Sequence, residues 1–404
     1  MKVACVGNMN NMLFVLCRYL RDEGIDCDLL LFNNEMDHFL PSNDTFDEDY
    51  TSYTKVLEWG DINSFKTTSQ KKIVADLKEY DFIIATQAPA FMYKAGINID
   101  VFVPAGGELI ITPFLFDKLD YVKRLRQLSL WKFIRYTKFG IQKSIIINQE
   151  PFSEYFRSPL SKLRVLSKTY YFGTPFVYRK IYKENLLLPH RYRDLREKND
   201  LIIVNQARQL WVTHDTMGHE SKGSDVIIRG YSQFLKKKPK ISSKLLLFEY
   251  GPDVDYTKAL INELDISSNV IWLPRMQRKE LMTFVKMADF ACGEFKPGCI
   301  GGLTTWESLA TGTCLLHYLN EKVVKFHNFT GPYPFINVPN ASSLADTLND
   351  FQENSLKYVT IGKNGEKWYE DNFEKRCMKE WLKLIEIKMN GGQKSLIKYC
   401  NEQI

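Results

Sequence analysis

The sequence lacks the features that would place it in a membrane or outside the cell. No apolar run among its 404 residues approaches the roughly 20 needed to span a bilayer, and MKVACVGNMN leads directly into a strand-like segment. The eight cysteines show no CxxC spacing, and Cys5, Cys292 and Cys314 stand inside apolar strand-like runs. We therefore expect a cytoplasmic protein whose thiols are reduced and buried, without disulfides or a cysteine metal site.

Two further signatures are missing. The first glycine turn, Gly7–Asn10, departs from GxGxxG, so the chain has no dinucleotide fingerprint. Histidines are few, and His38 is the only one before residue 178. His214 and His219 lie five residues apart, a poor spacing for one face of a helix, and no cysteine is near them. We expect neither a metal nor a resident cofactor.

What is present is a repeated alternation of strands and helices. A length of 404 residues favours two domains, and 45% hydrophobic with 25% charged residues is typical of a soluble globular protein. The alternation restarts after a polar, charged stretch at 178–199. It predicts an α/β protein with two doubly wound parallel-sheet, Rossmann-like domains facing across a cleft. The expected boundaries are 1–180, 181–375 and a C-terminal helix over 376–404 that packs back toward the first domain.

The first half also contains segments with a weaker pattern. Residues 34–70 are polar and rich in turn residues, which predicts a long loop over the sheet. Thr169–Phe172 has the composition of a strand, and we expect it to be among the last strands of this half.

The most informative stretch is Ala288–Leu316, ADFACGEFKPGCIGGLTTWESLATGTCLL. It predicts a strand at Phe290–Cys292, a glycine-bearing loop, a helix that begins near Thr304 and ends at Gly312, and another strand. Glycines before a helix let a ligand approach the unpaired N–H groups and positive dipole end of that helix, which suits a phosphate. Glu307 then offers a carboxylate to two ribose hydroxyls. The alternative is an ordinary strand–helix unit with a surface glutamate.

A second candidate position lies in the first half. The turn Pro104-Ala105-Gly106-Gly107-Glu108 follows a predicted strand at Asp100–Val103, and ligands of open α/β sheets bind at the carboxyl ends of strands. Glu108 is therefore a candidate to hold or deprotonate an acceptor hydroxyl. Alternatively, it only caps the next element.

Residues 118–143 form a basic amphipathic segment. After Asp120 it has seven Lys and Arg residues and no acid, interleaved with apolar residues such as Trp131 and Ile134. Such a helix can lie on an anionic membrane surface. The alternative is a solvated helix whose apolar stripe packs on the sheet. No nucleic-acid recognition module accompanies the basic residues, so we expect no nucleic-acid partner.

The second half resembles the donor-binding domain of GT-B fold glycosyltransferases, particularly the large retaining group often called family four. Four pieces match in order between about 200 and 350. They are a strand that ends in an arginine (IIVNQARQL), a lysine-glycine pair before a helix (SKGSDVIIRGYSQFL), a strand and turn (NVIWLPRM), and the run GGLTTWESLATGTCLL. The first half matches only in its strand–helix rhythm and glycine turn.

The resemblance implies a nucleotide-sugar donor and roles for particular residues. Charge develops on the β-phosphate as the glycosidic bond breaks, and fixed cations and helix N-termini stabilise it without a metal. The resemblance assigns Arg208 and Lys222 to the diphosphate and Glu307 to the ribose. The alternatives are an arginine paired with a surface acid and a solvated lysine. The remaining donor-binding candidates are the phosphate loop Gly301, Gly302, Leu303, Thr304 and Thr305, and Arg275 and Met276 beside the base.

The chain departs from that family at two points. The family's glutamate that contacts the donor sugar stands eight positions before Glu307, where this chain has Cys299. Glu294 from an altered loop, or Lys296 with backbone groups, then holds the sugar, or the site is degenerate. The histidine that many members carry in the first domain has no counterpart other than His38.

The resulting hypothesis is a metal-independent glycosyltransferase that moves a sugar from a nucleoside-diphosphate sugar to a hydroxyl acceptor. We expect the acceptor to be a saccharide or lipid-linked saccharide in surface polysaccharide or glycan assembly, with the protein cytoplasmic and peripheral on the inner membrane face. The alternatives are a non-catalytic relative that binds a nucleotide sugar or a partner, and a sugar-nucleotide epimerase.

Overall fold

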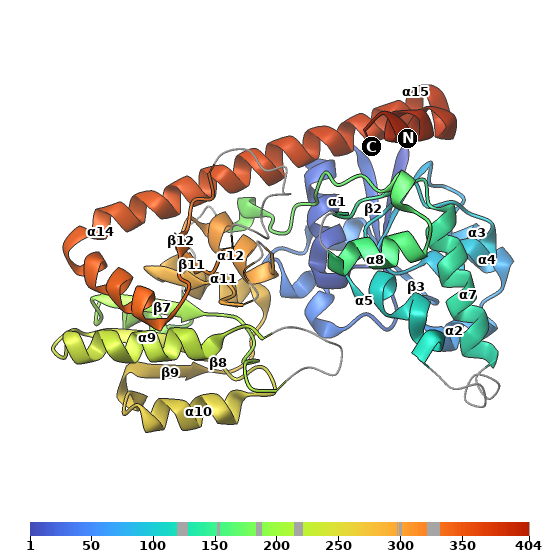
Figure 1. Ribbon diagram of the computed structural model, residues 1–404. Helices are drawn as coiled ribbons and strands as arrows, with labels where there is room; N and C mark the ends of the chain where they lie inside the picture. The colour runs from blue at the N-terminus through green and yellow to red at the C-terminus, as the bar shows by residue number, and fades with distance from the viewer. Residues whose placement is uncertain are drawn as a thin grey trace. The chain divides into compact units, whose positions relative to one another are not determined.

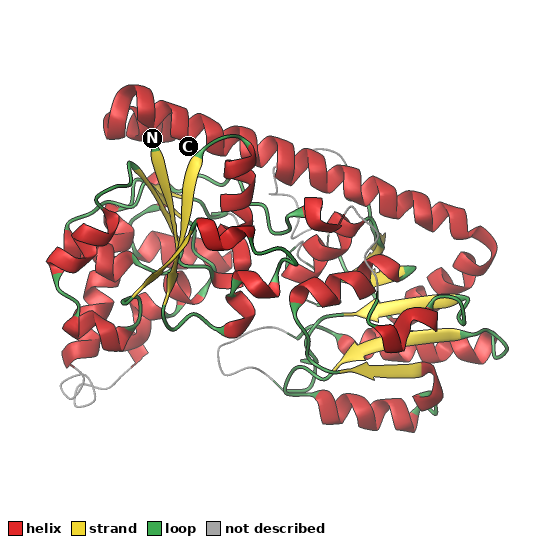
Figure 2. Ribbon diagram, turned by 180° about the vertical axis from the view of Figure 1, so that it is seen from behind, coloured by secondary structure: helices red, strands yellow, loops and turns green. Residues whose placement is uncertain are grey.

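The computed structural model describes residues 1–118, 128–151, 154–182, 188–213, 221–296, 298, 301–320 and 332–403. They form two compact units, one made of Met1–Tyr178 with Phe373–Ile404 and the other of Arg179–Asn372. In each unit a parallel β-sheet lies between helices (Figures 1 and 2).

The first unit contains a parallel sheet of six strands in the order β3-β2-β1-β4-β5-β6. Its strands are β1 (Lys2–Val6), β2 (Asp26–Phe32), β3 (Thr54–Leu57), β4 (Phe82–Ala85), β5 (Val101–Phe102) and β6 (Ile146–Ile147). Its helices are α1 (Met12–Asp22), α2 (Ile62–Thr67), α3 (Gln70–Leu77), α4 (Pro89–Ala95), α5 (Gly107–Ile110), α7 (Leu128–Lys143), α8 (Glu154–Lys162) and α15 (Cys377–Gln403).

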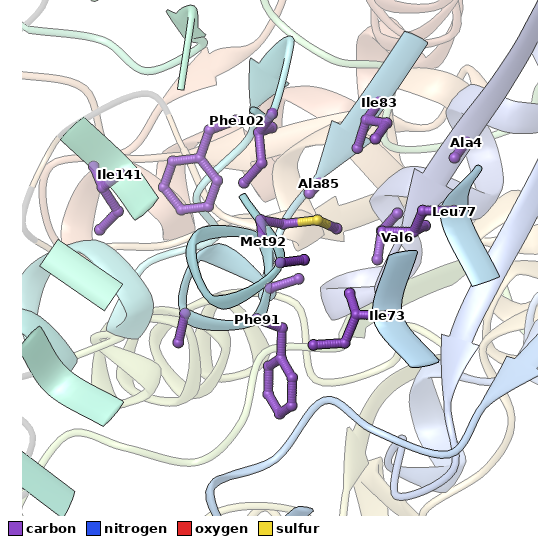
Figure 3. Packing of buried hydrophobic residues seen from close by; sticks show 14 of the residues in the cluster. Ala4, Val6, Ile73, Leu77, Ile83, Ala85, Phe91, Met92, Phe102 and Ile141 are labelled. Carbon is purple, nitrogen blue, oxygen red and sulfur yellow. The ribbon is translucent and has the colours of Figure 1, made fainter. Parts of the chain in front are cut away.

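The central strands of this sheet are apolar on both faces because helices cover both faces. Val3–Val6 of β1 is fully buried, as are the strand β4 residues Phe82, Ile84 and Ala85. Helix α4 contributes Phe91 and Met92 to the core, and the side chain of Met92 is directed at Val6 in Figure 3. Continuous apolar runs therefore mark these strands in the sequence.

The prediction of a long loop over 34–70 is wrong, because β3 and α2 lie within it. Strand β3 is at the edge of the sheet and pairs only with β2. Its two middle residues, Lys55 and Val56, are exposed, so it lacks the apolar alternation that identifies a strand. Helix α2 has six residues and starts at a capping box formed by Asp61 and Ser64.

The predicted strand at Thr169–Phe172 is also absent. Only an isolated bridge joins Thr169 to Ile147 of β6. The Asn148 side chain accepts hydrogen bonds from the backbone N–H groups of Phe172 and Gly173 at 3.2 and 3.3 Å. These side-chain bonds replace the backbone ladder that would extend the strand.

The C-terminal segment of the chain belongs to the first unit. A π-helical turn at Glu370–Arg376 precedes α15. The Trp381 indole donates to the carbonyl of Gly173 at 3.2 Å, and Lys388 forms an ion pair with the buried Asp100.

The second unit contains six parallel strands in the order β12-β11-β10-β7-β8-β9. The strands are β7 (Leu201–Asn205), β8 (Ser243–Phe248), β9 (Val270–Leu273), β10 (Phe290–Cys292), β11 (Cys314–His317) and β12 (Ile336–Asn337). The helices are α9 (Ser224–Lys237), α10 (Val254–Glu263), α11 (Arg278–Met287), α12 (Leu303–Thr311) and α14 (Ala341–Tyr369).

Both sheets have the strand order of a doubly wound fold, in which the direction of winding reverses at the middle of the sheet. The predicted fold class, two doubly wound parallel-sheet domains, is confirmed. In the second unit the reversal lies between β7 and β10, and the loops that follow these two strands meet at the carboxyl edge.

Candidate functional site

The predicted donor-binding residues of the second unit follow the strands at its carboxyl edge. Arg208 comes after β7, Arg275 after β9 and Glu294 after β10. The helix α12, which begins at Leu303, follows the same loop as Glu294. In doubly wound sheets this edge, at the point where the winding reverses, is where ligands bind.

A hydrogen bond brings the chain around Arg208 close to Lys222. Between them lies an insertion, 209–221, of which 214–220 is outside the described residues. The backbone N–H of Lys222 donates to the carbonyl of Leu210 at 2.6 Å, which joins the two ends of the insertion. This hydrogen bond thus holds together the two backbone segments that carry the predicted phosphate-binding cations.

Asp253 anchors the backbone at the start of the insertion. Its carboxylate accepts hydrogen bonds from the backbone N–H groups of Trp211, Val212 and Thr213, and one from the Thr213 hydroxyl at 2.6 Å. Burial raises the pKa of Asp253, but these hydrogen bonds outweigh it and lower the pKa below its ordinary value. The Trp211 indole adds a bond to the Thr257 hydroxyl at 2.9 Å.

Lys222 also joins the loop after β10. Its ammonium forms an ion pair with the Glu294 carboxylate, and its carbonyl accepts from the backbone N–H of Phe295 at 3.0 Å. Gly223, with φ of +69°, follows at the N-cap of α9, where a Cβ would lie 2.9 Å from that of Phe295. In the lysine-glycine pair, Lys222 therefore places a cation beside Glu294, and Gly223 avoids a clash with Phe295.

The backbone of Glu294 is held on both sides. Its N–H donates to Nδ1 of the fully buried His317 at 3.1 Å, and its carbonyl accepts from the N–H of Tyr318 at 3.0 Å. A Cβ at Gly293 would strike the His317 ring, so this close approach requires glycine. His317 acts here as a hydrogen-bond acceptor, which requires that its Nδ1 carry no proton.

The turn before α12 is shaped by short-range contacts. Gly302, the N-cap, has φ of +84°, and a Cβ there would strike Oε1 of Glu294. The Thr305 hydroxyl donates to the carbonyl of Gly301 at 2.9 Å. Gln206, which follows β7, donates to the carbonyl of Thr304 at 3.2 Å and so ties the first turn of α12 to the strand. The Thr304 hydroxyl is buried and has no hydrogen-bond partner among the described residues.

Glu307, predicted to bind ribose, is in a buried ion pair. Nε of Arg278, the first residue of α11, donates to its Oε1 at 2.8 Å, and the two side chains are 9% and 3% exposed. The pair fixes the orientation of the Glu307 carboxylate toward α11.

The turn after β9 lies beside an aromatic ring. The exposed Arg275 guanidinium lies over the ring of Tyr250 at 5.4 Å, and Tyr250, which follows β8, is 43% exposed. Met276 packs against the apolar cluster under β8 and β9. Lys296 is exposed, and Cys299 lies outside the described residues.

Glu108 lies in the first unit, in α5 at the carboxyl edge of that sheet. Its carboxylate accepts from the backbone N–H of Ala105 and from the Thr86 hydroxyl at 3.4 Å. The residue as a whole is partly exposed. Burial raises the pKa of Glu108 to about 7, and backbone N–H groups such as that of Ala105 offset only part of the rise. A carboxyl group with this pKa can accept a proton near neutral pH.

Three residues at the carboxyl edge of the second sheet were not predicted from the sequence: Tyr250, Arg278 and His317. Each follows or ends a buried strand or opens the next helix, and that position was the available signal. His214 and His219 lie outside the described residues. Within the described ranges, no three His, Cys, Asp or Glu residues group as metal ligands.

The order of the strands in the two parallel sheets matches the GT-B architecture of two Rossmann-like domains. No protein-family model matches the sequence, and no curated protein matches it. Solved structures, in contrast, match over nearly the whole chain.

One such structure is the Anabaena protein HepE in complex with UDP, with a TM-score of 0.61 at 16% identity over 96% of this chain and 100% of that one. Sucrose-phosphate synthase from Thermosynechococcus elongatus matches with a TM-score of 0.56 at 14% identity, over 97% and 100%. A putative UDP-N-acetylglucosamine 2-epimerase from Listeria monocytogenes matches with 0.57 at 10% identity, over 96% of each. At these identities the likeness shows the fold, which glycosyltransferases and epimerases share.

Proposed function

We propose that this protein transfers a sugar from a nucleoside-diphosphate sugar to a hydroxyl group. The observation that carries the proposal is the position of the Lys222 ammonium, which pairs with a carboxylate lying against Gly302 at the N-terminus of α12. A cation and the positive end of a helix thus face one point at the carboxyl edge of the sheet. UDP complexes of structures with this fold, HepE among them, support a nucleotide donor.

The chemistry needs positive charge at that point. The bond between the sugar carbon and the β-phosphate oxygen breaks, and its electron pair goes to the diphosphate. Lys222 and Arg208 stabilise the charge as it develops, so they act on the transition state more than on the substrate. The acceptor oxygen forms the new bond, and Glu108 takes its proton. We propose that no metal takes part, so transfer should persist in EDTA.

The other donor groups have partners on the same edge. The exposed ring of Tyr250, with Arg275 over it, offers a surface on which a base can stack. Glu307 is the proposed ribose contact, and Arg278 holds its carboxylate in one orientation. Thr304 has a buried hydroxyl without a partner among the described residues, in the first turn of α12.

The proposed acceptor is a saccharide or lipid-linked saccharide, at the cytoplasmic membrane face, in surface polysaccharide or glycan assembly. Helix α7 supports the membrane part. Among its described residues, Lys132, Arg135 and Lys143 are exposed, and the helix has no acid. Trp131 is 44% exposed, with the Arg135 guanidinium 5.1 Å from its ring.

The rest of the apolar stripe of α7 packs inside the first unit. Ile134 and Ile141 are buried, and Phe133 packs edge-on against Phe65. The described face therefore offers one aromatic anchor and several cations, and its docking would be mainly electrostatic. Residues 119–127 of the predicted basic segment lie outside the described residues. No helix in the described ranges combines the length and apolar content needed to cross a membrane.

Vesicle flotation tests the membrane part. Vesicles with anionic lipid should float the wild type at low salt, and Lys132→Glu with Arg135→Glu should abolish flotation. A matched control is Lys236→Glu with Lys237→Glu, at the last turn of α9 in the second unit. Equal flotation of all three proteins would reject the membrane surface while leaving the transferase proposal intact.

An epimerase is the second candidate, because a putative epimerase shares the fold over 96% of both chains. Incubation with UDP-, GDP- and ADP-sugars separates the candidates. A transferase releases nucleoside diphosphate. An epimerase of the nucleotide sugar inverts one carbon of the sugar and leaves it attached to the nucleotide, and a non-catalytic relative binds without turnover. Release of nucleoside diphosphate that Lys222→Ala abolishes is the expected result.

A further inference from the structure

Glu294 places a negative charge at the point proposed for the donor phosphate. Its carboxylate pairs with the Lys222 ammonium, and its Oε1 lies so close to Gly302 that a Cβ there would strike it. Gly302 is the N-cap of α12. A carboxylate between a lysine and a helix N-terminus receives the same two stabilising interactions as a phosphate oxygen.

The pair is mostly withdrawn from solvent. The side chains of Lys222 and Glu294 are 23% and 10% exposed, so water screens their attraction less than it screens a surface pair. An anion that takes the Lys222 ammonium must therefore first replace this interaction.

The backbone and the side chain of Glu294 differ in freedom. The His317 ring and the N–H of Tyr318 hold its backbone N–H and carbonyl in place. The carboxylate, at the end of a side chain with three rotatable bonds, is held by Lys222. Rotation of the side chain alone releases the ammonium without moving the backbone of Glu294.

We propose that Glu294 is an internal counterion that competes with the donor diphosphate for Lys222 and the N-terminus of α12. The proposal rests on the proposed function. When the diphosphate binds, the Glu294 side chain rotates away, and its carboxylate becomes available to the sugar hydroxyls. The chain thereby supplies a carboxylate from position 294, where the position eight residues before Glu307 holds a cysteine.

The test is calorimetric binding of UDP, GDP and ADP to the wild type and to Glu294→Gln. Gln keeps the size of the side chain but removes its charge, so affinity for the preferred diphosphate should rise about tenfold. Because glutamine can still accept a hydrogen bond from Lys222, Glu294→Ala is a second variant. It should bind the diphosphate at least as tightly as Glu294→Gln does. Thermal unfolding of each variant establishes that it is folded.

The matched control is Asp346→Asn. Asp346 pairs with Lys237 at 3.1 Å, and both side chains are more than half exposed. This variant removes the same charge from an ion pair of the same unit, at the far end of α9, and should leave the affinity unchanged.

The possible failures are distinguishable. If the wild type binds a diphosphate and both Glu294 variants bind it equally or more weakly, the counterion proposal is wrong and the proposed function stands. Unchanged affinity for the diphosphate with weaker binding of its sugar conjugate makes Glu294 a sugar contact only, which also overturns the proposal. If no diphosphate binds to any of the proteins, both proposals are wrong.

Discussion

The backbone N–H of Lys222 donates to the carbonyl of Leu210 across 2.6 Å. This bond closes the insertion that separates Lys222 from Arg208 in the sequence. The Asp253 carboxylate holds the start of the insertion by accepting hydrogen bonds from three backbone N–H groups. The backbone beside Arg208 and the backbone of Lys222 are therefore held next to each other.

Removal of the Lys222 ammonium should abolish most of the catalysis. Lys222→Ala should lower the rate of sugar transfer about 100- to 1,000-fold, the usual effect of losing one group that stabilises transition-state charge. Lys237→Ala, in which a lysine is lost from the exposed end of α9, is the control. A rate for Lys222→Ala within threefold of the control, measured as release of nucleoside diphosphate, would exclude Lys222 from the chemistry.

The two adjacent glycines before α12 should respond differently to alanine. Gly302→Ala forces a side chain into φ of +84° and against Glu294, and should lower the free energy of unfolding by about 1–2 kcal/mol or more. A Cβ at Gly301 meets no atom of the described residues within 4 Å, so Gly301→Ala should be nearly neutral. Urea unfolding of both variants measures the difference. Equal stabilities would show that Gly302 is not under this constraint.

The ion pair between Arg278 and Glu307 should show strong coupling. Arg278→Met leaves a buried carboxylate without this partner and should destabilise the protein by about 3–5 kcal/mol. Adding Glu307→Gln removes the charge and should restore much of the loss. Chemical unfolding of the two single variants and the double variant provides the cycle. A double variant that is no more stable than Arg278→Met contradicts this account.

Glu108 should give both activity and stability a pH dependence near neutrality. The carboxylate accepts the acceptor's proton only when ionised, so activity should rise with pH through about 7, and Glu108→Gln should remove the rise. The stability effect has the opposite sign. The folded-state pKa lies above the ordinary value of 4.5, so in this range the folded protein binds more protons than the unfolded one. The free energy of unfolding should therefore fall by about 1–3 kcal/mol as pH increases from 4.5 past 7.

Glu35 provides the control for that experiment. Burial raises its pKa to about 7 as well, and its Oε2 is buried without a partner among the described residues. Glu35→Gln should flatten the stability profile in the same pH window and leave the pH profile of activity in place. If Glu35→Gln removes the rise in activity and Glu108→Gln does not, Glu108 is not the base.

Much of the fold could be predicted from the sequence because hydrophobic periodicity follows burial. The central strand β10, at Phe290–Cys292, has the predicted bounds. Two strands at the edges, β3 and β12, do not follow this rule. β3 is half exposed and β12 has two residues, so neither shows a pattern. The Asn148 side chain ended the predicted strand at Thr169–Phe172 through contacts that no local pattern records.

The site divides in a similar way. The family resemblance assigns Arg208 and Lys222 to the diphosphate, and the structure places their positions, after a strand and before a helix, at one edge of the sheet. Pairings could not be selected, because they join distant parts of the chain. Glu294 lies 72 residues from Lys222, and Arg278 lies 29 residues from Glu307. Side-chain geometry decides these pairs, and sequence spacing carries no information on it.

The most direct test of the central claim is a crystal structure with a bound nucleoside diphosphate. The pyrophosphate should lie within hydrogen-bond distance of the Lys222 ammonium and of the first turn of α12, with the Glu294 carboxylate turned away from Lys222. A nucleotide bound elsewhere, or a pyrophosphate remote from Lys222 while the pair with Glu294 stays intact, would contradict the central claim.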